Sequence, residues 1–323
     1  MHVYPIRLVP RVCARVWGGH RLEGRFGRSL PMPAPAGESW EVHGDLPVAN
    51  GPYRGRTLDE LALQEGPALL GRSCPPGSRF PLLVKWLDCE DWLSVQVHPD
   101  DETARRLTGD PSARGKTECW YIAEAAPGAE VLHGLAEGAT PEDLARARGS
   151  GLLGHLRRLR PRTGEVLFTP AGTVHALGPG LLILEIQQSC DLTYRLYDWD
   201  RPGLDGRPRP LHEAEALEVI RSVRPEPEAR QPGGLVGEPR ISCSHFSLES
   251  LSSPATWSPR GESMEILALV GGEGRVRADE EAERLSPGDV VVLPAATRRV
   301  QLELDPGALV LRARVPEGAA VPA

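Results

Sequence analysis

One segment of the chain occurs twice, 124 residues apart. The first copy is Gly164-Glu-Val-Leu-Phe-Thr-Pro-Ala-Gly-Thr-Val-His175, and the second is Gly288-Asp-Val-Val-Val-Leu-Pro-Ala-Ala-Thr-Arg-Arg299. Both contain a Gly, an acid, three mainly apolar residues and a Pro six positions after the Gly, a pattern that predicts a tight turn followed by a short strand. Repetition of such a unit indicates two related β domains.

The first copy resembles the second motif of cupin-type jelly rolls, Gly-x5-Pro-x-Gly-x2-His, whose His binds a metal ion. In the second copy Ala296 replaces the second Gly and Arg299 replaces the His. We therefore expect an all-β fold, a tandem of two double-stranded β-helices (cupin-like jelly rolls) with a small α-helical insertion around 57–70 and 135–160. The metal site is expected in the first roll only.

Metal-binding residue types occur in three places within the first half of the fold. Gln96 and His98 are two residues apart in an apolar strand, so their side chains project from the same face. Glu118 and His175 follow in separate motifs. Two imidazoles, a carboxylate and an amide oxygen form a donor set suited to Zn²⁺ or a similar divalent ion.

Strand and helix signals alternate along the chain. Strands are predicted at 80–99, 118–124, 129–133, 165–170 and 181–187, and short strands again from 241 onward. Thr57 with Glu60 and Thr140 with Asp143 form capping boxes that begin helices, the second of which we expect to continue through His155–Leu159. A further helix is predicted over 211–223.

The pattern predicts three parts of the chain. Residues 1–223 form the catalytic, metal-binding jelly-roll domain with its helical insertion. The Pro-, Glu- and Gly-rich stretch 224–240 is a linker. Residues 241–323 form a C-terminal jelly-roll domain that lacks the metal site.

Composition excludes several classes of partner. The 323 residues contain no apolar run long enough to span a membrane and no apolar signal-peptide core, so we expect a cytoplasmic protein with no membrane partner. A net charge of −7 without a long basic block argues against nucleic acid, although a local pocket for an anionic metabolite is compatible with it. The six cysteines form no CxxC pair, so we expect free, mostly buried thiols, with Cys119 in the core.

Cation usage is strongly biased. The chain contains 35 Arg and two Lys, Lys85 and Lys116. Lysine differs from arginine where a compact, titratable ammonium group is needed. Lys116 lies two residues before Glu118, on the same strand face, so we expect a functional role for Lys116 more than for Lys85.

Many uncommon sequence motifs, in a consistent order along the chain, indicate a resemblance to a known family. The chain resembles the type I phosphomannose isomerases, particularly their short bacterial form, densely over roughly residues 4–225 and thinly thereafter. The matching motifs include Val-Trp-Gly-Gly at 16–19, Gly-Glu-Ser-Trp-Glu at 37–41, Asp-Trp-Leu-Ser-Val-Gln-Val-His-Pro at 91–99, Gly-Lys-Thr-Glu-Cys-Trp-Tyr at 115–121, Leu-Glu-Ile-Gln-Gln-Ser at 184–189 and Thr-Tyr-Arg-Leu-Tyr-Asp-Trp-Asp-Arg at 193–201.

The resemblance implies an activity and a set of site residues. It implies zinc-dependent interconversion of D-mannose 6-phosphate and D-fructose 6-phosphate, with one Zn²⁺ per chain. The implied metal ligands are Gln96, His98, Glu118 and His175. The implied catalytic residues are Arg195, Lys116 and Glu38. Cys190 and Leu192 depart from the residues common in the short form, at positions that would not hold the metal.

Several alternatives stay open at this stage. Arg195 contacts either the substrate or, as a structural ion pair, Asp198 or Asp200, which follow it closely in sequence. The proton-transferring base is Lys116, Glu38 or a water molecule at the metal. Rival functions are a metallo-cupin acting on a different phosphosugar, an Fe²⁺ oxygenase, or a non-catalytic sugar-phosphate sensor. The sequence does not predict the oligomeric state.

Overall fold

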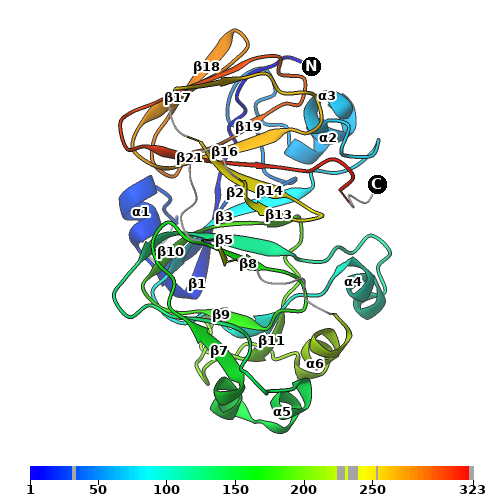
Figure 1. Ribbon diagram of the computed structural model, residues 1–323, viewed down its shortest axis with the longest axis vertical. Helices are drawn as coiled ribbons and strands as arrows, with labels where there is room; N and C mark the ends of the chain where they lie inside the picture. Colours follow the sequence, from blue (N-terminus) through cyan, green and yellow to red (C-terminus); the bar gives the residue numbers. More distant parts are fainter. Residues whose placement is uncertain (31–33, 224–229, 232–238, 252–253, 320–323) are drawn as a thin grey trace.

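The computed structural model describes residues 1–30, 34–223, 230–231, 239–251 and 254–319. Within these residues the chain is mostly β and forms four sheets of antiparallel strands, arranged along the long axis of the molecule (Figure 1). The predicted all-β class with a tandem of cupin-like rolls is confirmed. No helix in this described part of the chain is long and apolar enough to cross a membrane.

Two facing sheets form what we call the first roll. A seven-stranded sheet has the order β1-β2-β3-β10-β5-β8-β12, and a five-stranded sheet has the order β11-β4-β9-β6-β7. The seven strands are β1 (Arg11–Gly19), β2 (Ala36–Val42), β3 (Leu82–Cys89), β10 (Leu181–Gln188), β5 (Glu118–Ala125), β8 (Val166–Thr169) and β12 (Arg230–Gln231). The five are β11 (Tyr194–Tyr197), β4 (Val95–Val97), β9 (His175–Leu177), β6 (Val131–Leu135) and β7 (Leu156–Leu159).

Two further sheets form the second roll. Their orders are β13-β14-β21-β16-β19 and β15-β20-β17-β18. The first contains β13 (Pro239–Ser242), β14 (Ser247–Leu251), β21 (Leu309–Arg314), β16 (Glu265–Gly271) and β19 (Val290–Leu293). The second contains β15 (Ala255–Trp257), β20 (Val300–Leu304), β17 (Gly274–Ala278) and β18 (Glu281–Leu285).

Each roll closes over its own apolar interior. In the first, Trp120 and Ile183 of the larger sheet pack in one buried cluster with Val131 of the smaller sheet. In the second roll, Leu267 and Val300 lie on opposite sheets and pack in another buried apolar cluster. Side chains alternate along each strand, so the residues not facing this interior face solvent or the neighbouring part of the chain.

The two copies of the sequence repeat have the same local structure. Gly164 and Gly288 both adopt left-handed backbone, with φ of 88° and 86°, in the turns that precede β8 and β19. Only glycine takes this conformation without strain. After each strand the chain turns at the Pro, where the Thr173 and Thr297 amides donate to the Pro170 and Pro294 carbonyls.

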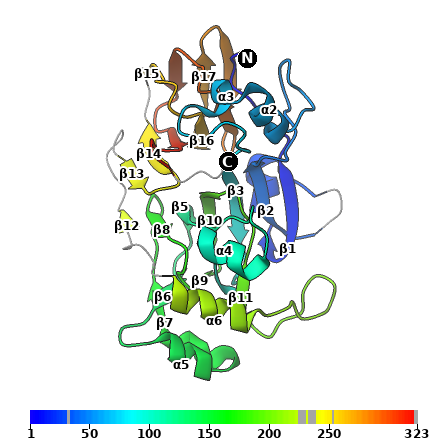
Figure 2. The ribbon, with the colours of Figure 1, turned by 90° about the vertical axis from the view of Figure 1, so that its right-hand side faces the viewer.

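Short helices cover the edges and ends of the rolls (Figures 1 and 2). They are α1 (Arg21–Phe26), α2 (Leu58–Glu65), α3 (Pro67–Leu70), α4 (Asp101–Thr108), α5 (Pro141–Arg146), the 3₁₀ helix η1 (Gly149–His155) and α6 (Glu213–Ser222). Both predicted capping boxes are present, at Thr57 and at Thr140. The sequence did not predict α1 and α4.

One helix prediction is wrong. The segment expected to continue as helix through Leu159 ends as η1 at His155, and Leu156–Leu159 forms β7. The Leu-x-x-Leu spacing suits a helix face, but pairing of Leu159 with Val131 of β6 gives the backbone its hydrogen bonds instead. Tertiary pairing therefore overrides the local pattern.

The beginning of the chain packs against the second roll. The Ile6 and Val292 backbones bond each other in both directions at 2.9 Å, and the Ala295 amide donates to the Leu69 carbonyl. Figure 1 shows this N-terminal segment running beside β19 and β16. The predicted boundaries at 223 and 241 stay a prediction, and most of the predicted linker lies outside the described residues.

The six cysteines are free thiols, as predicted. Cys119 is fully buried and contributes to the core cluster that joins the first roll to the second. Cys119 thus has the predicted packing role, on the strand face opposite Glu118.

Helix α2 offers a matched test of packing in the core cluster that joins the two rolls, because it contributes Leu61 to this cluster. Leu61 is 0% exposed, whereas Leu63, two residues on, is 58% exposed. We expect Leu61→Ala to lower the free energy of unfolding by about 2–5 kcal/mol because it leaves a cavity. Leu63→Ala should change it by less than about 0.5 kcal/mol. Urea unfolding followed by circular dichroism measures both, and equal losses would contradict the packing described.

Candidate active site

Three predicted ligands meet between the two sheets of the first roll. His98 directly follows β4, Glu118 begins β5 and His175 begins β9. Their nearest donor atoms all lie within 4.8 Å of one another, and all three side chains are buried. Residues far apart in sequence thus form one compact His-Glu-His cluster.

Backbone carbonyls orient both imidazoles. The Nδ1 atoms of His98 and His175 lie 2.9 Å from the Leu192 and Thr173 carbonyl oxygens. A carbonyl only accepts hydrogen bonds, so each Nδ1 carries the proton and each Nε2 keeps its lone pair. The two Nε2 atoms lie 3.7 and 3.3 Å from Glu118 Oε1, so both lone pairs point into the cluster.

Burial keeps these imidazoles neutral. It lowers the pKa of His175 to about 3. It also lowers the pKa of His98 well below its ordinary value, with the positive charge of Lys116 adding to the effect. A neutral imidazole is the form that binds a metal ion, and no proton must be displaced from Nε2 near pH 7.

The Glu118 carboxylate lacks the hydrogen bonds that a buried anion requires. Neither oxygen has a hydrogen bond of good geometry among the described residues. The Lys116 ammonium lies 2.9 Å from Oε2 and balances the charge, but its Nζ also lies 3.3 Å from the His98 Nε2 lone pair. A divalent cation would satisfy the carboxylate and both imidazoles together, so the donor set fits a catalytic metal site.

Gln96 lies beside the cluster on β4, paired with His175 of β9. Its Nε2 is 3.3 Å from His175 Nε2, while its Oε1 accepts a hydrogen bond from Ser94 Oγ at 3.1 Å. A half-turn of the amide would exchange these two atoms and point the oxygen at the cluster. The position, though not this amide orientation, suits the predicted fourth ligand.

A cavity of about 360 Å³ lies next to the cluster, and its lining includes Gln96 and Lys116, which contact the cluster. Its charged lining comprises five cations and three acids, namely Arg15, Lys85, Lys116, Arg195 and Arg209 with Glu38, Glu185 and Asp191. The whole chain has net charge −7, so cations are concentrated locally. Both lysines of the chain line this cavity, which indicates a site for an anionic small molecule.

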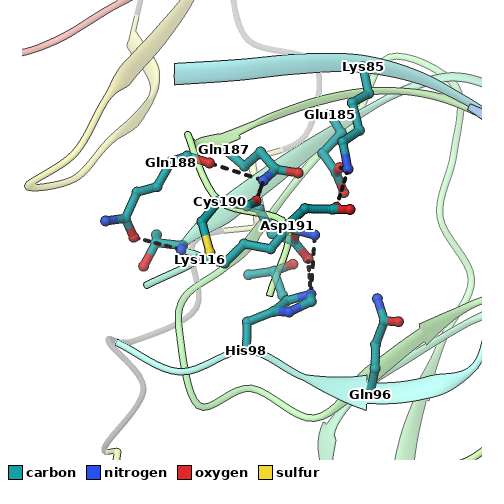
Figure 3. Close-up of polar contacts among 12 residues, drawn as sticks. Lys85, Gln96, His98, Lys116, Glu185, Gln187, Gln188, Cys190 and Asp191 are labelled. Atoms are coloured by element: carbon teal, nitrogen blue, oxygen red, sulfur yellow. Dashed lines mark hydrogen bonds and ion pairs between the residues drawn. The ribbon is translucent and has the colours of Figure 1, made fainter. Parts of the chain in front are cut away.

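Acidic side chains surround the two lysines; Glu38, Glu118 and Glu185 are buried, whereas Asp191 is exposed (Figure 3). Lys85 Nζ lies 2.9 Å from Asp191, 3.7 Å from Glu38 and 3.8 Å from Glu185. Burial alone would lower the pKa of both ammonium groups, but the surrounding carboxylates raise it. Both lysines therefore stay protonated in the metal-free protein.

Of the five cavity cations, Arg195 is the one that has no ion pair among the described residues. It lies on β11 opposite Gln96, and its buried Nε has no hydrogen-bond partner among the described residues. Burial and the nearby Arg209 lower its pKa. An arginine held in this way is a ready site for a bound anion.

The alternative of a structural ion pair for Arg195 is not what the structure shows. Asp198 binds Arg209 through both carboxylate oxygens at 2.6 Å and also binds Arg201. Asp200 instead accepts a hydrogen bond from the Tyr197 hydroxyl. The substrate-facing alternative is therefore the one that the geometry supports.

Glu38 lies across the cavity from the cluster. It accepts two hydrogen bonds from Arg15, at 2.8 and 3.1 Å, and one from Trp40 Nε1. Burial would raise its pKa, but Lys85 and Arg15 outweigh burial and lower it to about 2. A carboxylate so well stabilised is a weak proton acceptor.

Sequence reasoning did not single out several lining residues. Glu185 is a lone acid in the apolar strand β10, and this isolation was a signal that it faces a polar site. Arg15 lies in the middle of β1, and Asp191 and Arg209 lie in loops; none of the three had a local sequence pattern that indicated a site. Burial raises the pKa of Glu185, which makes it a better proton acceptor than Glu38.

Fold and site together define the class. This is a cupin-like β-roll protein with a buried metal-capable cluster next to a cation-lined cavity. The family model for the phosphomannose isomerase type I catalytic domain matches residues 6–118. The chain is 36% identical over 310 residues to the mannose-6-phosphate isomerase of Streptococcus mutans, covering 93% of this chain and 96% of that protein.

Further comparisons agree. The chain is 37% identical to the mannose-6-phosphate isomerase ManA of Bacillus subtilis over 315 residues, which are 94% of this chain and 97% of that protein. The solved mannose 6-phosphate isomerase of B. subtilis matches with a TM-score of 0.82 at 31% identity, covering 96% of this chain and 99% of that one. The chain belongs to the type I phosphomannose isomerase family.

The cluster predicts which histidines hold metal. We expect His98→Ala and His175→Ala to lower the bound divalent metal at least about tenfold, because each removes one of few donors. His133→Gln changes another buried histidine outside the cluster and should keep the metal. Elemental analysis of dialysed protein measures this, and a metal-replete His175→Ala protein would contradict the assignment.

Proposed function

We propose that the chain is a zinc-dependent mannose-6-phosphate isomerase, an intramolecular oxidoreductase of the aldose–ketose isomerase type. It interconverts D-mannose 6-phosphate and D-fructose 6-phosphate with one Zn²⁺ per chain, in the cytoplasm. The observation that carries the proposal is the buried His-Glu-His cluster next to a cavity lined by five cations. The names of the relatives supply the choice of phosphosugar.

His98, Glu118 and His175 would hold the metal, with Gln96 as the fourth ligand. When bound, the metal supplies Lewis acidity that polarises the sugar carbonyl and stabilises the enediolate. The carbonyl contacts at both Nδ1 atoms fix the imidazoles before any metal arrives. The first roll, residues 1–223, is in this proposal the catalytic domain, and residues 241–323 form a roll without metal.

The acids and lysines divide the proton chemistry. In the aldose-to-ketose direction a base takes the proton from C2 and returns it to C1, while a proton passes from O2 to O1. We assign the base to Glu185, whose carboxylate lines the cavity with a raised pKa. Lys116 stays protonated and donates hydrogen bonds to the sugar oxygens. Glu38, ionised throughout, holds Lys85 and Arg15 in place.

Arg195 anchors the substrate. Its guanidinium has no anionic partner among the described residues, so a phosphate or enediolate oxygen would be its counter-ion. Binding energy gained at a remote phosphate orients the reacting carbons. The cavity has cations at two places, around Lys116 and around Arg195. This arrangement suits a substrate that carries the negative charge of a phosphate at one end and develops the negative charge of an enediolate at the other.

The proposal is tested by assaying the purified protein on mannose 6-phosphate before and after chelation. Metal content is determined on the same samples. We expect turnover to disappear with the metal and to return with added Zn²⁺, because the enediolate loses its stabilising charge. Activity that survives complete metal removal would refute the proposal. Bound metal without turnover on mannose 6-phosphate would shift it to another phosphosugar or to a sensor.

Removing the unpartnered guanidinium should separate binding from metal content. We expect Arg195→Ala to keep its metal and to lower kcat/KM about 10²–10³-fold, since a charge-assisted contact to the substrate is lost. Arg207→Ala, in an exposed part of the following loop, is the matched control and should leave kcat/KM unchanged. An Arg195→Ala enzyme with normal kcat/KM would contradict the role given to this residue.

A further inference from the structure

The second roll contains a cavity of about 540 Å³ that the proposed isomerase chemistry does not use. Its walls come from β14, β15, β16 and β21, and it opens at one end of the roll. Glu265 precedes Leu267 and Leu269 on the same face of β16, and those two leucines belong to the interior cluster. The cavity is therefore the mouth of the roll interior.

Strand register shows that this mouth is the counterpart of the isomerase site. Glu118 pairs with Thr169, which precedes the Pro of the first repeat copy. Glu265 pairs with Leu293, which precedes the Pro of the second copy. Glu265 thus occupies the place of the ligand Glu118.

The neighbouring strands extend the correspondence. In the first roll Lys85 of β3 pairs with Glu185 of β10. In the second roll the equivalent strands β14 and β21 place Glu249 opposite Arg312. The pair is conserved in position but reversed in charge, so the two mouths select different ligands.

The histidines of the metal cluster have no equivalents here. Arg299, at the repeat position of His175, is exposed. Instead, Arg312 donates to Glu249 Oε1 at 3.0 Å and to Glu265 Oε1 at 3.4 Å, and Arg314 lies 3.1 Å from the same Glu249 oxygen. The charged lining of this cavity comprises three arginines and four acids, Arg260, Arg312 and Arg314 with Glu249, Glu262, Glu265 and Glu317, so it offers no excess of cations for a phosphate.

A stability role alone explains this network poorly. Moving Glu265 and Arg312 out of water is costly, and apolar residues of similar size would serve a purely structural role at least as well. Among the described residues every hydrogen bond and ion pair of Glu249 uses Oε1, which leaves Oε2 of this cavity-lining residue available as an acceptor. A free acceptor, arginine donors and an open volume together are features of a binding site.

Trp257 supplies the apolar surface. Its indole nitrogen donates to Glu265 Oε2 at 2.8 Å, and the Arg312 guanidinium stacks on its ring at 4.9 Å. The ring is thereby held in one orientation at the cavity wall. Sugar rings have an apolar C–H face that packs on aromatic rings and hydroxyls that pair with carboxylate and guanidinium groups.

We propose that the mouth of the second roll binds an uncharged sugar, with the part of the half-buried Trp257 ring that Arg312 does not cover as its stacking surface and Glu249 and Arg312 as its hydroxyl partners. The site is separate from the isomerase cavity. It does not depend on the proposed isomerase activity, so the failure of one proposal leaves the other standing.

The test titrates full-length protein with methyl α-D-mannoside, methyl α-D-glucoside and sucrose, followed by tryptophan fluorescence and saturation-transfer NMR. These probes have no phosphate and no free aldehyde or ketone group. We expect saturable binding of at least one probe, weakened about tenfold or more in Trp257→Ala and in Glu249→Gln because a stacking surface or an acceptor is lost. Isomerase activity should be unchanged in both variants.

Matched variants locate the binding. Arg195→Ala, in the isomerase cavity, should bind the neutral probe as the unmodified protein does. Glu249→Gln keeps the size of the side chain and guards against misfolding of Trp257→Ala, with thermal unfolding as the check. Absence of saturable binding for all three probes would overturn the proposal. So would binding that Arg195→Ala abolishes and Trp257→Ala retains, or tighter Trp257-dependent binding of mannose 6-phosphate.

Discussion

The register of β10 with β3 and β5 is the constraint on which the site depends. It sets Glu185 opposite Lys85 and Gln187 opposite Glu118, on one face of the seven-stranded sheet. A slip of β10 by one residue would turn Glu185 and Gln187 to the other face of the sheet and place apolar residues of β10 in the cavity. Continuous pairing along eight residues of β10 makes such a slip costly.

Electrostatics in the cavity follows from that arrangement. Acids and lysines that would be unstable alone in a buried place stabilise one another, so Lys85 and Lys116 remain charged. The two imidazoles remain neutral because burial penalises their charged form. Among the described residues Arg195 has no counter-ion, so its charge is available to the anionic substrate of the proposed reaction.

The two rolls share one backbone scaffold but differ in the charged side chains at their mouths. The same strand order places an acid at Glu118 and at Glu265, but the surrounding charges and the histidines differ. Backbone pairing tolerates any side chain that suits its face, so the mouth of a roll can change its ligand while the interior stays apolar. The two rolls therefore share a scaffold and differ in a few side chains at their mouths.

The sequence by itself determined what depends on local spacing. The one-residue gap between Gln96 and His98, the repeat ending at His175 and the caps at Thr57 and Thr140 each follow from backbone periodicity over a few residues. These patterns predicted the roll architecture and identified candidate residues of the His-Glu-His cluster. They failed at Leu156–Leu159, where a helix-like spacing gave way to strand pairing.

Tertiary structure decided which groups become partners. Asp198 and Asp200 follow Arg195 closely in sequence, yet Asp198 binds Arg209 and Asp200 binds Tyr197. The contacts of Lys85 with Glu185 and Asp191, and the cavity beside Trp257, arise between strands distant in the chain. Local periodicity fixes the face from which a side chain projects, but its charge partner depends on long-range packing that no short pattern encodes.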